Sequence, residues 1–193
     1  MNSSKTKWVI IDTETTGLAA PIYVVELAGQ LMEGWEAVGE PFQMLLNHEV
    51  WVPSQAQAVH GYSREYLRRH GQEPRVVHEA FRDYAKDYPL VAHNLSFDWD
   101  RCLAPEWARL GIPQVGRRGF CSLLLSRRLV REAASHRLDV LKAHFGLSRS
   151  RGHQAKNDVL TVVELFQKVY RARLEAAGCD CFEAVAAFSR ARR

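Results

Sequence analysis

Long apolar runs are missing from this chain of 193 residues. None approaches the roughly 20 consecutive apolar residues that a membrane-spanning helix requires. Residues 1–7 are polar and lack the apolar stretch and the small-residue cleavage site of a secretory signal peptide. Internal repeats, low-complexity segments and Gly/Ser/Pro-rich linkers are missing as well. We therefore expect one soluble, cytoplasmic domain, residues 1–193, with no membrane partner.

Cysteine is scarce and irregularly placed. Cys102 and Cys121 are isolated, and Cys179 and Cys181 are separated by one residue. A zinc site would need paired Cys-x-x-Cys units or a Cys/His quartet, and a small secreted domain would show a disulfide framework. We expect four reduced thiols. The remaining composition, 47% hydrophobic and 25% charged, is that of a globular protein and excludes disordered, collagenous and coiled-coil chains.

Positive charge is concentrated in one segment. Residues 1–116 carry ten basic and 15 acidic residues, whereas residues 117–151 carry nine basic against two acidic residues, a net charge of +7. Such a run is commonly the solvated face of an Arg-rich helix. The alternative is a basic flank that holds a nucleic-acid backbone beside an acidic centre. The charge pattern by itself leaves both interpretations open.

The hydrophobic pattern predicts a mixed sheet covered by helices, in the α/β class. Buried strands are expected at residues 8–11 and 90–92, and residues 22–32 and 37–46 are predicted to form two strands of a meander that turns around Gly34. Helical spacing and end signals predict helices at 53–61, from Pro74, at 97–110, 120–131 and 136–145, from Ala155 past Tyr170, and at 181–191.

Two carboxylates stand at the end of the first predicted strand, in Asp12-Thr13-Glu14-Thr15-Thr16-Gly17. Residues i and i+2 of a strand point to the same face, so the side chains of Asp12 and Glu14 converge. Two adjacent, partly desolvated carboxylates repel each other, and a divalent cation between them would make the pair tolerable. The alternative is a polar strand end in which Asp12 caps a turn.

Two later acidic motifs also allow ordinary structural explanations. Asp98, in His93-Asn94-Leu95-Ser96-Phe97-Asp98, falls in the first turn of a helix, where the helix dipole favours a carboxylate without any metal, and the same holds for Asp100. His153 and Asp158 belong to His153-Gln154-Ala155-Lys156-Asn157-Asp158, where Gly152 places the histidine in the loop that enters a helix. A surface histidine and a solvated aspartate are the alternative. None of the three motifs is decisive alone.

In this order and at this spacing, the three motifs together resemble the DEDD exonuclease superfamily, in its DnaQ-like, histidine-containing branch. That branch includes polymerase proofreading subunits, ribonuclease T, oligoribonuclease and exonuclease X. The resemblance runs from about Trp8 to Phe166, and further similar segments are Val25-Glu26-Leu27-Ala28, His60-Gly61-Tyr62-Ser63 and Val91-Ala92-His93-Asn94. It implies a ribonuclease H-like fold: a five-stranded mixed sheet with an antiparallel second strand and helices on both faces. The motif-bearing core would be residues 8–170, followed by a helical extension, residues 171–193.

The resemblance also implies the chemistry: a metal-dependent 3′→5′ exonuclease that releases nucleoside 5′-monophosphates from the 3′ ends of single-stranded DNA or RNA. Two Mg²⁺ or Mn²⁺ ions would be held by four carboxylates, with one histidine as general base and four residues shaping the substrate site. By this resemblance the four carboxylates are Asp12, Glu14, Asp98 and Asp158, and the general base is His153. The residues that shape the substrate site are Leu18, His60, Asn94 and Phe97. Asp100 matches no motif position.

Departures from the family pattern are small. Cys121-Ser122 stands where many relatives have Asp-Thr, and Lys156-Asn157 precedes the last aspartate, where small or apolar residues are common. A polymerase or a second copy of the chain as partner stays open. The competing function is a non-catalytic module on the same fold that binds nucleic acid or scaffolds a partner. Because all five catalytic positions are filled, the enzyme is favoured.

Overall fold

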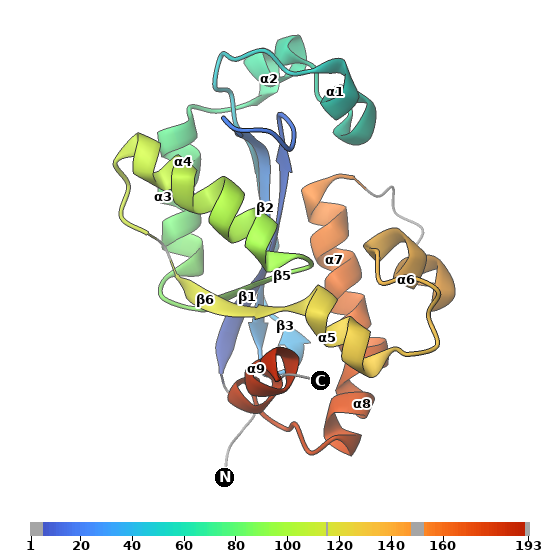
Figure 1. Cartoon of the computed structure of the whole chain (residues 1–193). Helices are drawn as coiled ribbons and strands as arrows, with labels where there is room; N and C mark the ends of the chain where they lie inside the picture. Colours follow the sequence, from blue (N-terminus) through green and yellow to red (C-terminus); the bar gives the residue numbers. More distant parts are fainter. Residues whose placement is uncertain (1–5, 115, 148–152, 192–193) are drawn as a thin grey trace.

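A computed structural model of the chain describes residues 6–114, 116–147 and 153–191 (Figure 1). A central sheet is flanked by helices on both sides. Its strands are β1 (Lys7–Thr15), β2 (Val24–Glu33), β3 (Glu36–Ala37), β4 (Phe42–Leu45), β5 (Pro89–Ala92) and β6 (Arg117–Cys121). The α-helices are α1 (Ser54–His60), α2 (Arg64–His70), α3 (Pro74–Ala85), α4 (Ala104–Leu110), α5 (Ser122–Leu129), α6 (Leu138–His144), α7 (Ala155–Leu165), α8 (Arg171–Ala176) and α9 (Phe182–Arg190), and the π-helical segments are η2 (Ser96–Leu103) and η3 (Phe166–Tyr170).

The sheet is mixed, as predicted, with the order β3-β2-β1-β5-β6 and β4 also paired to β2. β1 runs antiparallel to β2 and parallel to β5, which runs parallel to β6. The predicted count of five is wrong by one, because the described residues form six strands. The strand expected at 37–46 is split into β3 and β4, since Gly39 adopts a φ of 68° and Pro41 has no amide hydrogen to donate.

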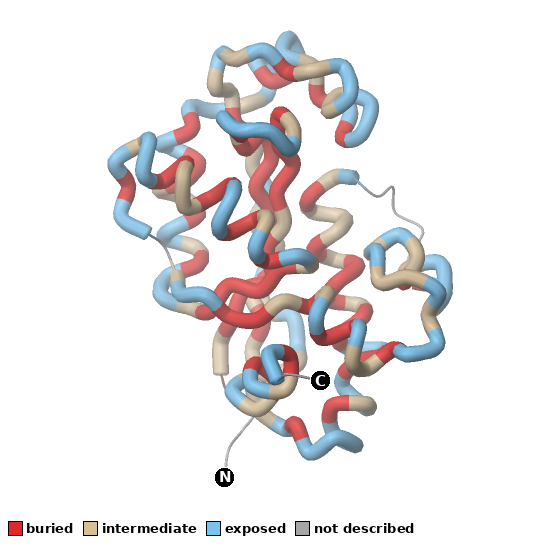
Figure 2. Tube along the Cα trace, in the orientation of Figure 1, coloured by how far each residue is buried: buried red, intermediate tan, exposed pale blue. Residues whose placement is uncertain are grey.

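The two faces of β1 bury two different cores. Trp8 and Ile10 belong to the core that α5, α7 and α9 cover, whereas Val9 and Ile11 belong to the core beneath α3, η2 and α4. Figure 2 shows the resulting buried band along the central strands. Residues of opposite parity in β1 therefore face different helices, and this division continues into the polar end of the strand.

Most predicted helices are present, with three differences. The helix expected at 97–110 consists of the π-helical segment η2 followed by α4. The helix expected at 120–131 begins at Ser122, because Phe120 and Cys121 still belong to β6. Helix α2 was not predicted: Leu67 is its buried residue, so it shows no apolar period. Its one local signal is Ser63, whose Oγ accepts a hydrogen bond from the backbone N–H of Tyr66 as an N-cap.

The cysteines and the helix lengths bear on two expectations about the whole chain. All four cysteines are free thiols, as expected. None of the described helices is long and apolar enough to cross a membrane.

Candidate active site

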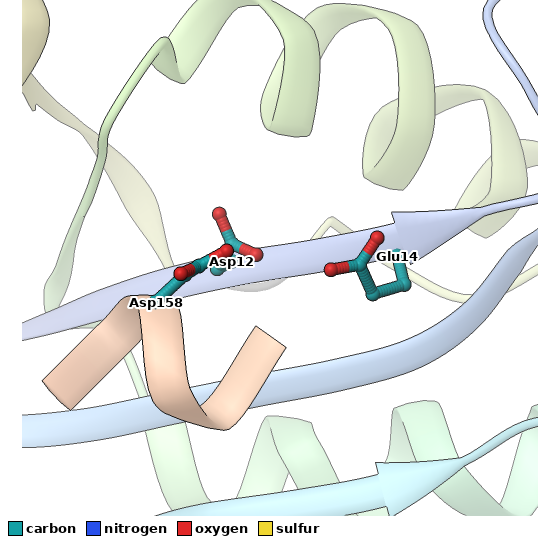
Figure 3. A group of neighbouring side chains, drawn as sticks. All are labelled: Asp12, Glu14 and Asp158. Atoms are coloured by element: carbon teal, nitrogen blue, oxygen red, sulfur yellow. The ribbon is translucent and has the colours of Figure 1, made fainter. Parts of the chain in front are cut away.

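Three carboxylates meet where the end of β1 passes beneath the start of α7. Asp12 and Glu14 come from β1 and Asp158 from the first turn of α7, and each offers an oxygen that lies within 4.8 Å of the other two (Figure 3). Asp12 and Glu14 have the parity of Trp8 and Ile10, so they point to the face that α7 covers. We call Asp12, Glu14 and Asp158 the carboxylate cluster.

The carboxylate cluster holds negative charge in a poorly solvated place. Burial, and after it the charges of Asp98 and Asp158, raise the pKa of Asp12 well above its usual value. Burial and the neighbouring carboxylates raise the pKa of Glu14 to about 8, and burial also raises the pKa of Asp158. Oxygen donors that converge and repel one another in this way fit a hard divalent cation such as Mg²⁺ or Mn²⁺.

Asp98 reaches the same region from the opposite face of the sheet. It lies on η2, is 3% exposed, and its Oδ1 accepts a hydrogen bond of 2.8 Å from the hydroxyl of Thr13. Thr13 has the parity of Ile11, which faces η2. Burial raises the pKa of Asp98 to about 7, although its hydrogen bonds, the one from Thr13 among them, act to lower it. Asp98 thus lies close enough to Asp12 to raise its pKa, but outside the group of three converging oxygens.

His153 is exposed and lies in the turn that enters α7, with a φ of 61°. Its backbone N–H donates to Oδ2 of Asp158 over 3.1 Å, which ties the turn to the carboxylate cluster. The structure therefore brings His153 next to Asp158, at the entrance to the site. Residues 148–152, which precede it, lie outside the described residues.

A fifth carboxylate, that of Glu26, holds the start of α7 in place, a role that the sequence motifs did not indicate. It is fully buried on β2, opposite Glu14 in the β1–β2 register. Its Oε2 accepts hydrogen bonds from the backbone N–H of Ala155 (2.9 Å) and the hydroxyl of Tyr62 (3.0 Å), and its Oε1 accepts one from the side-chain amide of Gln43 (2.7 Å). A glutamate within an apolar strand was the signal that could have found it.

An apolar hollow of about 920 Å³ opens on the Glu14 side of the cluster. The predicted residues Leu18, His60 and Phe97 all line it, together with Trp51. Leu18 and Trp51 are 70% and 71% exposed, which is unusual for side chains of this size. His60 is buried; its Nδ1 accepts a hydrogen bond from the backbone N–H of Tyr62, and its Nε2 has no hydrogen-bond partner among the described residues. Trp51 was missed, although it stands in a polar loop before Pro53.

A second hollow, of about 930 Å³, opens on the Asp158 side, and we call it the basic hollow. Its polar lining includes Asn94, Arg127, His136, Arg137, Asp139, Lys142, His153 and Asp158. Asn94 thus faces a different hollow from the other three predicted substrate residues. His93 also lines it, but both of its ring nitrogens are engaged, by Ser122 Oγ and the His136 carbonyl, and burial lowers its pKa to about 4. Its place is therefore structural.

Asp100 lies apart from both hollows. Its side chain is half exposed and forms an ion pair with Arg118. This agrees with the structural interpretation that the sequence favoured for it.

Comparison with known proteins agrees with this architecture. Residues 9–166 match the family model RNase_T, described as exonuclease. The chain is 30% identical over 192 residues to a DNA polymerase III subunit epsilon-like protein of Rhodobacter capsulatus, an alignment that spans 94% of this chain and 26% of that protein. It is 28% identical over 160 residues to a PolC-type DNA polymerase III of Streptococcus pneumoniae, across 82% of this chain and 11% of that one. The chain thus spans about a quarter or less of these curated relatives.

Solved structures show the same fold. E. coli exonuclease I in a complex with single-stranded DNA superposes with a TM-score of 0.78 at 17% identity, covering 89% of this chain and 41% of that one. Exonuclease X in complex with 5′ overhanging duplex DNA gives a TM-score of 0.69 at 22% identity, covering 94% of this chain and 99% of that one. The chain belongs to the exonuclease family, as a DnaQ-like member of the DEDD superfamily.

Proposed function

We propose that this chain is a metal-dependent 3′→5′ exonuclease of the histidine-containing DEDD type, which removes nucleoside 5′-monophosphates from single-stranded DNA or RNA. The observation that carries the proposal is the convergence of Asp12, Glu14 and Asp158 within 4.8 Å on a chain of the exonuclease family. Two proteins of the same fold were solved with DNA, one of them with a single strand. Because the choice between DNA and RNA depends on contacts to the 2′-hydroxyl, both strands belong in the test.

We assign the metal to the carboxylate cluster, with Asp98 as the fourth ligand. The donors are all carboxylate oxygens, which suits two Mg²⁺ or Mn²⁺ ions better than zinc. When bound, such ions supply Lewis-acid stabilisation of the phosphate and lower the pKa of water. Glu26 is excluded as a ligand, because both of its oxygens already accept hydrogen bonds from the protein.

The chain's own residues then divide the remaining work. His153 accepts the proton of the attacking water, because its imidazole is solvent-exposed beside Asp158 and a ring nitrogen can take up a proton. The apolar hollow holds the 3′-terminal nucleoside, with Leu18 and Trp51 against the base. Since His60 Nδ1 accepts a hydrogen bond, its Nε2 carries the proton and can donate to the sugar or base.

We further propose that residues 1–193 form a single domain, with a core at 8–170 and an extension at 171–193. Val185 of the extension is buried in the same core as Trp8 and Phe120, and the ring of Phe182 lies 5.8 Å from that of Trp8. Such burial supports an extension that folds with the core rather than a separate module.

The test uses two strands of equal sequence, one DNA and one RNA, each labelled at the 5′ end. With Mg²⁺ or Mn²⁺ we expect a ladder of labelled products that shorten from the 3′ end, and no ladder with EDTA. Asp12→Ala should abolish the ladder, and Glu65→Ala, an exposed carboxylate on α2, should leave it unchanged. Tight binding of either strand without any metal-dependent ladder would replace the enzyme by the non-catalytic binding module.

A further inference from the structure

A third hollow, of about 700 Å³, lies between the end of α5 and the C-terminal helix α9, and we call it the outer hollow. Its polar lining is formed by Arg127, Arg128, His136, Ser189 and Arg190. Arg127 and His136 also line the basic hollow, so the two hollows share a wall. Helices α5 and α9 lie in contact (Figure 1). A continuous surface therefore leads from the carboxylate cluster past α5 to α9.

The lining of the outer hollow carries positive charge and, among the described residues, no acidic side chain. The basic hollow differs, because its Arg137 is paired with Asp139. Arg128 and Arg190 form no ion pair with any acidic residue in the described part of the chain. Many exposed arginines elsewhere do, as Arg69 does with Glu65 at 3.0 Å.

Arg128 gives the strongest indication that the outer hollow binds an anion. Its guanidinium lies 4.7 Å from the centre of the Phe188 ring and donates to the carbonyl of Ala191 over 2.8 Å. Its Nε–H is buried and has no hydrogen-bond partner within residues 6–114, 116–147 and 153–191. A buried donor that belongs to a charged group is normally satisfied. A phosphate matches the planar guanidinium of Arg128, which lines the outer hollow, and can be bound by those of its N–H groups that are not buried.

The apolar hollow has the opposite character, since its lining among the described residues includes no lysine or arginine. The carboxylate cluster thus lies between a neutral, apolar side and a basic side. If the proposed function holds, the terminal nucleoside occupies the apolar side and the scissile phosphate lies at the cluster. The rest of the strand must then leave across the basic side, where phosphates rather than bases meet the protein.

We propose that the outer hollow is a phosphate-binding subsite for the strand upstream of the scissile bond, and that α9 is part of the substrate interface. This inference rests on the proposed function for the direction of the strand. It extends the interface beyond residues 9–166, the part of the chain that matches the family. The basic segment predicted at 117–151 supplies only one wall, and its residues 148–151 lie outside the described residues.

Arg190 is the residue to replace first, because it is exposed and its Nε donates within its own helix, to the carbonyl of Ala186. Arg190→Glu should raise KM for a 20-nucleotide strand about tenfold and leave kcat unchanged. The salt dependence of strand binding should flatten by about 0.7 in log–log slope for each phosphate that is no longer neutralised. Hydrolysis of a dinucleotide, which has no phosphate upstream of the scissile bond, should not change. Arg69→Glu makes the same charge reversal at an exposed arginine of α2, so it is the matched control and should match wild type throughout.

Binding is measured separately, by fluorescence anisotropy of a labelled 20-nucleotide strand in EDTA, with unfolding curves for each variant. If wild type binds but does not hydrolyse, the proposed function fails and the subsite is still tested by the anisotropy of Arg190→Glu. If wild type hydrolyses and Arg190→Glu keeps its KM and salt slope, the subsite is refuted alone. Equal losses on the dinucleotide and the long strand would also refute it. The triple variant of Arg127, Arg128 and Arg131 to alanine should deepen the long-strand defect in the same assays.

Discussion

We expect the Glu14 carboxylate to destabilise the fold in the absence of metal, although the proposed reaction requires this side chain. Glu14 is 9% exposed, and its pKa is raised to about 8, first by burial and then by the charges of Asp158, Glu26 and Asp98. Because this pKa is above that of the unfolded chain, the folded protein holds a proton that the unfolded chain releases. The folded state is therefore most stable, with respect to this group, below about pH 4.5, where Glu14 is protonated in both states. This stability is lost as the pH rises towards 8.

The size of this effect follows from the pKa difference. Each pH unit between 4.5 and 7 costs up to about 1.4 kcal/mol, so the folded state loses about 3 kcal/mol by pH 7. That is a substantial part of the roughly 5–15 kcal/mol that stabilises a typical domain. Glu14→Gln keeps the shape and cannot ionise. We expect it to stabilise the metal-free protein at pH 7 by about 1–3 kcal/mol, which corresponds to about 3–10 °C in Tm.

The assay is thermal unfolding followed by circular dichroism, in EDTA, at pH 5, 6, 7 and 8. The Tm advantage of Glu14→Gln over wild type should grow with pH. Saturating Mn²⁺ should stabilise wild type more than the variant, because a ligand that binds only the folded state raises its stability, and the variant should have lost its activity. Glu65→Gln, on the exposed surface of α2, is the control and should show no pH-dependent gain. A Tm difference that stays constant or shrinks from pH 5 to 8 would refute the reasoning.

Three further predictions concern single side chains. His153→Ala leaves the carboxylates in place and should slow single-turnover cleavage about 10²–10⁴-fold with unchanged metal binding; a loss of cleavage that weaker metal binding fully explains would contradict the general-base role. Glu26→Gln should lower the free energy of unfolding by about 1–3 kcal/mol and weaken metal binding, because the backbone N–H at the start of α7 loses its carboxylate acceptor. Denaturant unfolding measures the first effect and metal titration the second. Unchanged metal affinity would restrict the role of Glu26 to folding. Asp100→Ala removes only a surface ion pair with Arg118 and should change stability by about 1 kcal/mol or less in denaturant unfolding; a loss of activity as large as that of Asp12→Ala would place Asp100 in the site.

Local periodicity explains why part of the site could be predicted. The alternation of β1 puts Asp12 and Glu14 on one face whatever packs there, so their convergence follows from the strand alone. The hydrophobic pattern indicated the mixed sheet, and the order of the motifs indicated the family. Asp158 could be placed because the turn at His153 ends where α7 begins. These inferences need only neighbours in the sequence or a pattern along it.

What could not be predicted depends on contacts between distant segments. The role of Glu26 needs the N–H of Ala155, which is 129 residues away in the chain. The separation of Asp98 from the other carboxylates needs η2 to cover the opposite face and Thr13 to hold it. The exposure of Trp51 depends on which loop borders the apolar hollow. The split of the strand at 37–46 has a local signal, because Gly39 favours a break there. That both halves stay in the sheet depends on their pairing with β2, which is a long-range contact.

The register between β1 and β2 connects the stability of the fold to the chemistry of the site. The two strands pair without interruption from Lys7 opposite Glu33 to Glu14 opposite Glu26, and the register shifts only after Glu14. A slip by one residue would move Trp8 and Ile10 out of their core, and it would also turn Asp12 and Glu14 towards η2. The burial of large apolar side chains thus opposes the repulsion among the carboxylates, because both depend on the same alternation. The strand tolerates a cluster of like charges at its end because its apolar residues are fully buried on both faces.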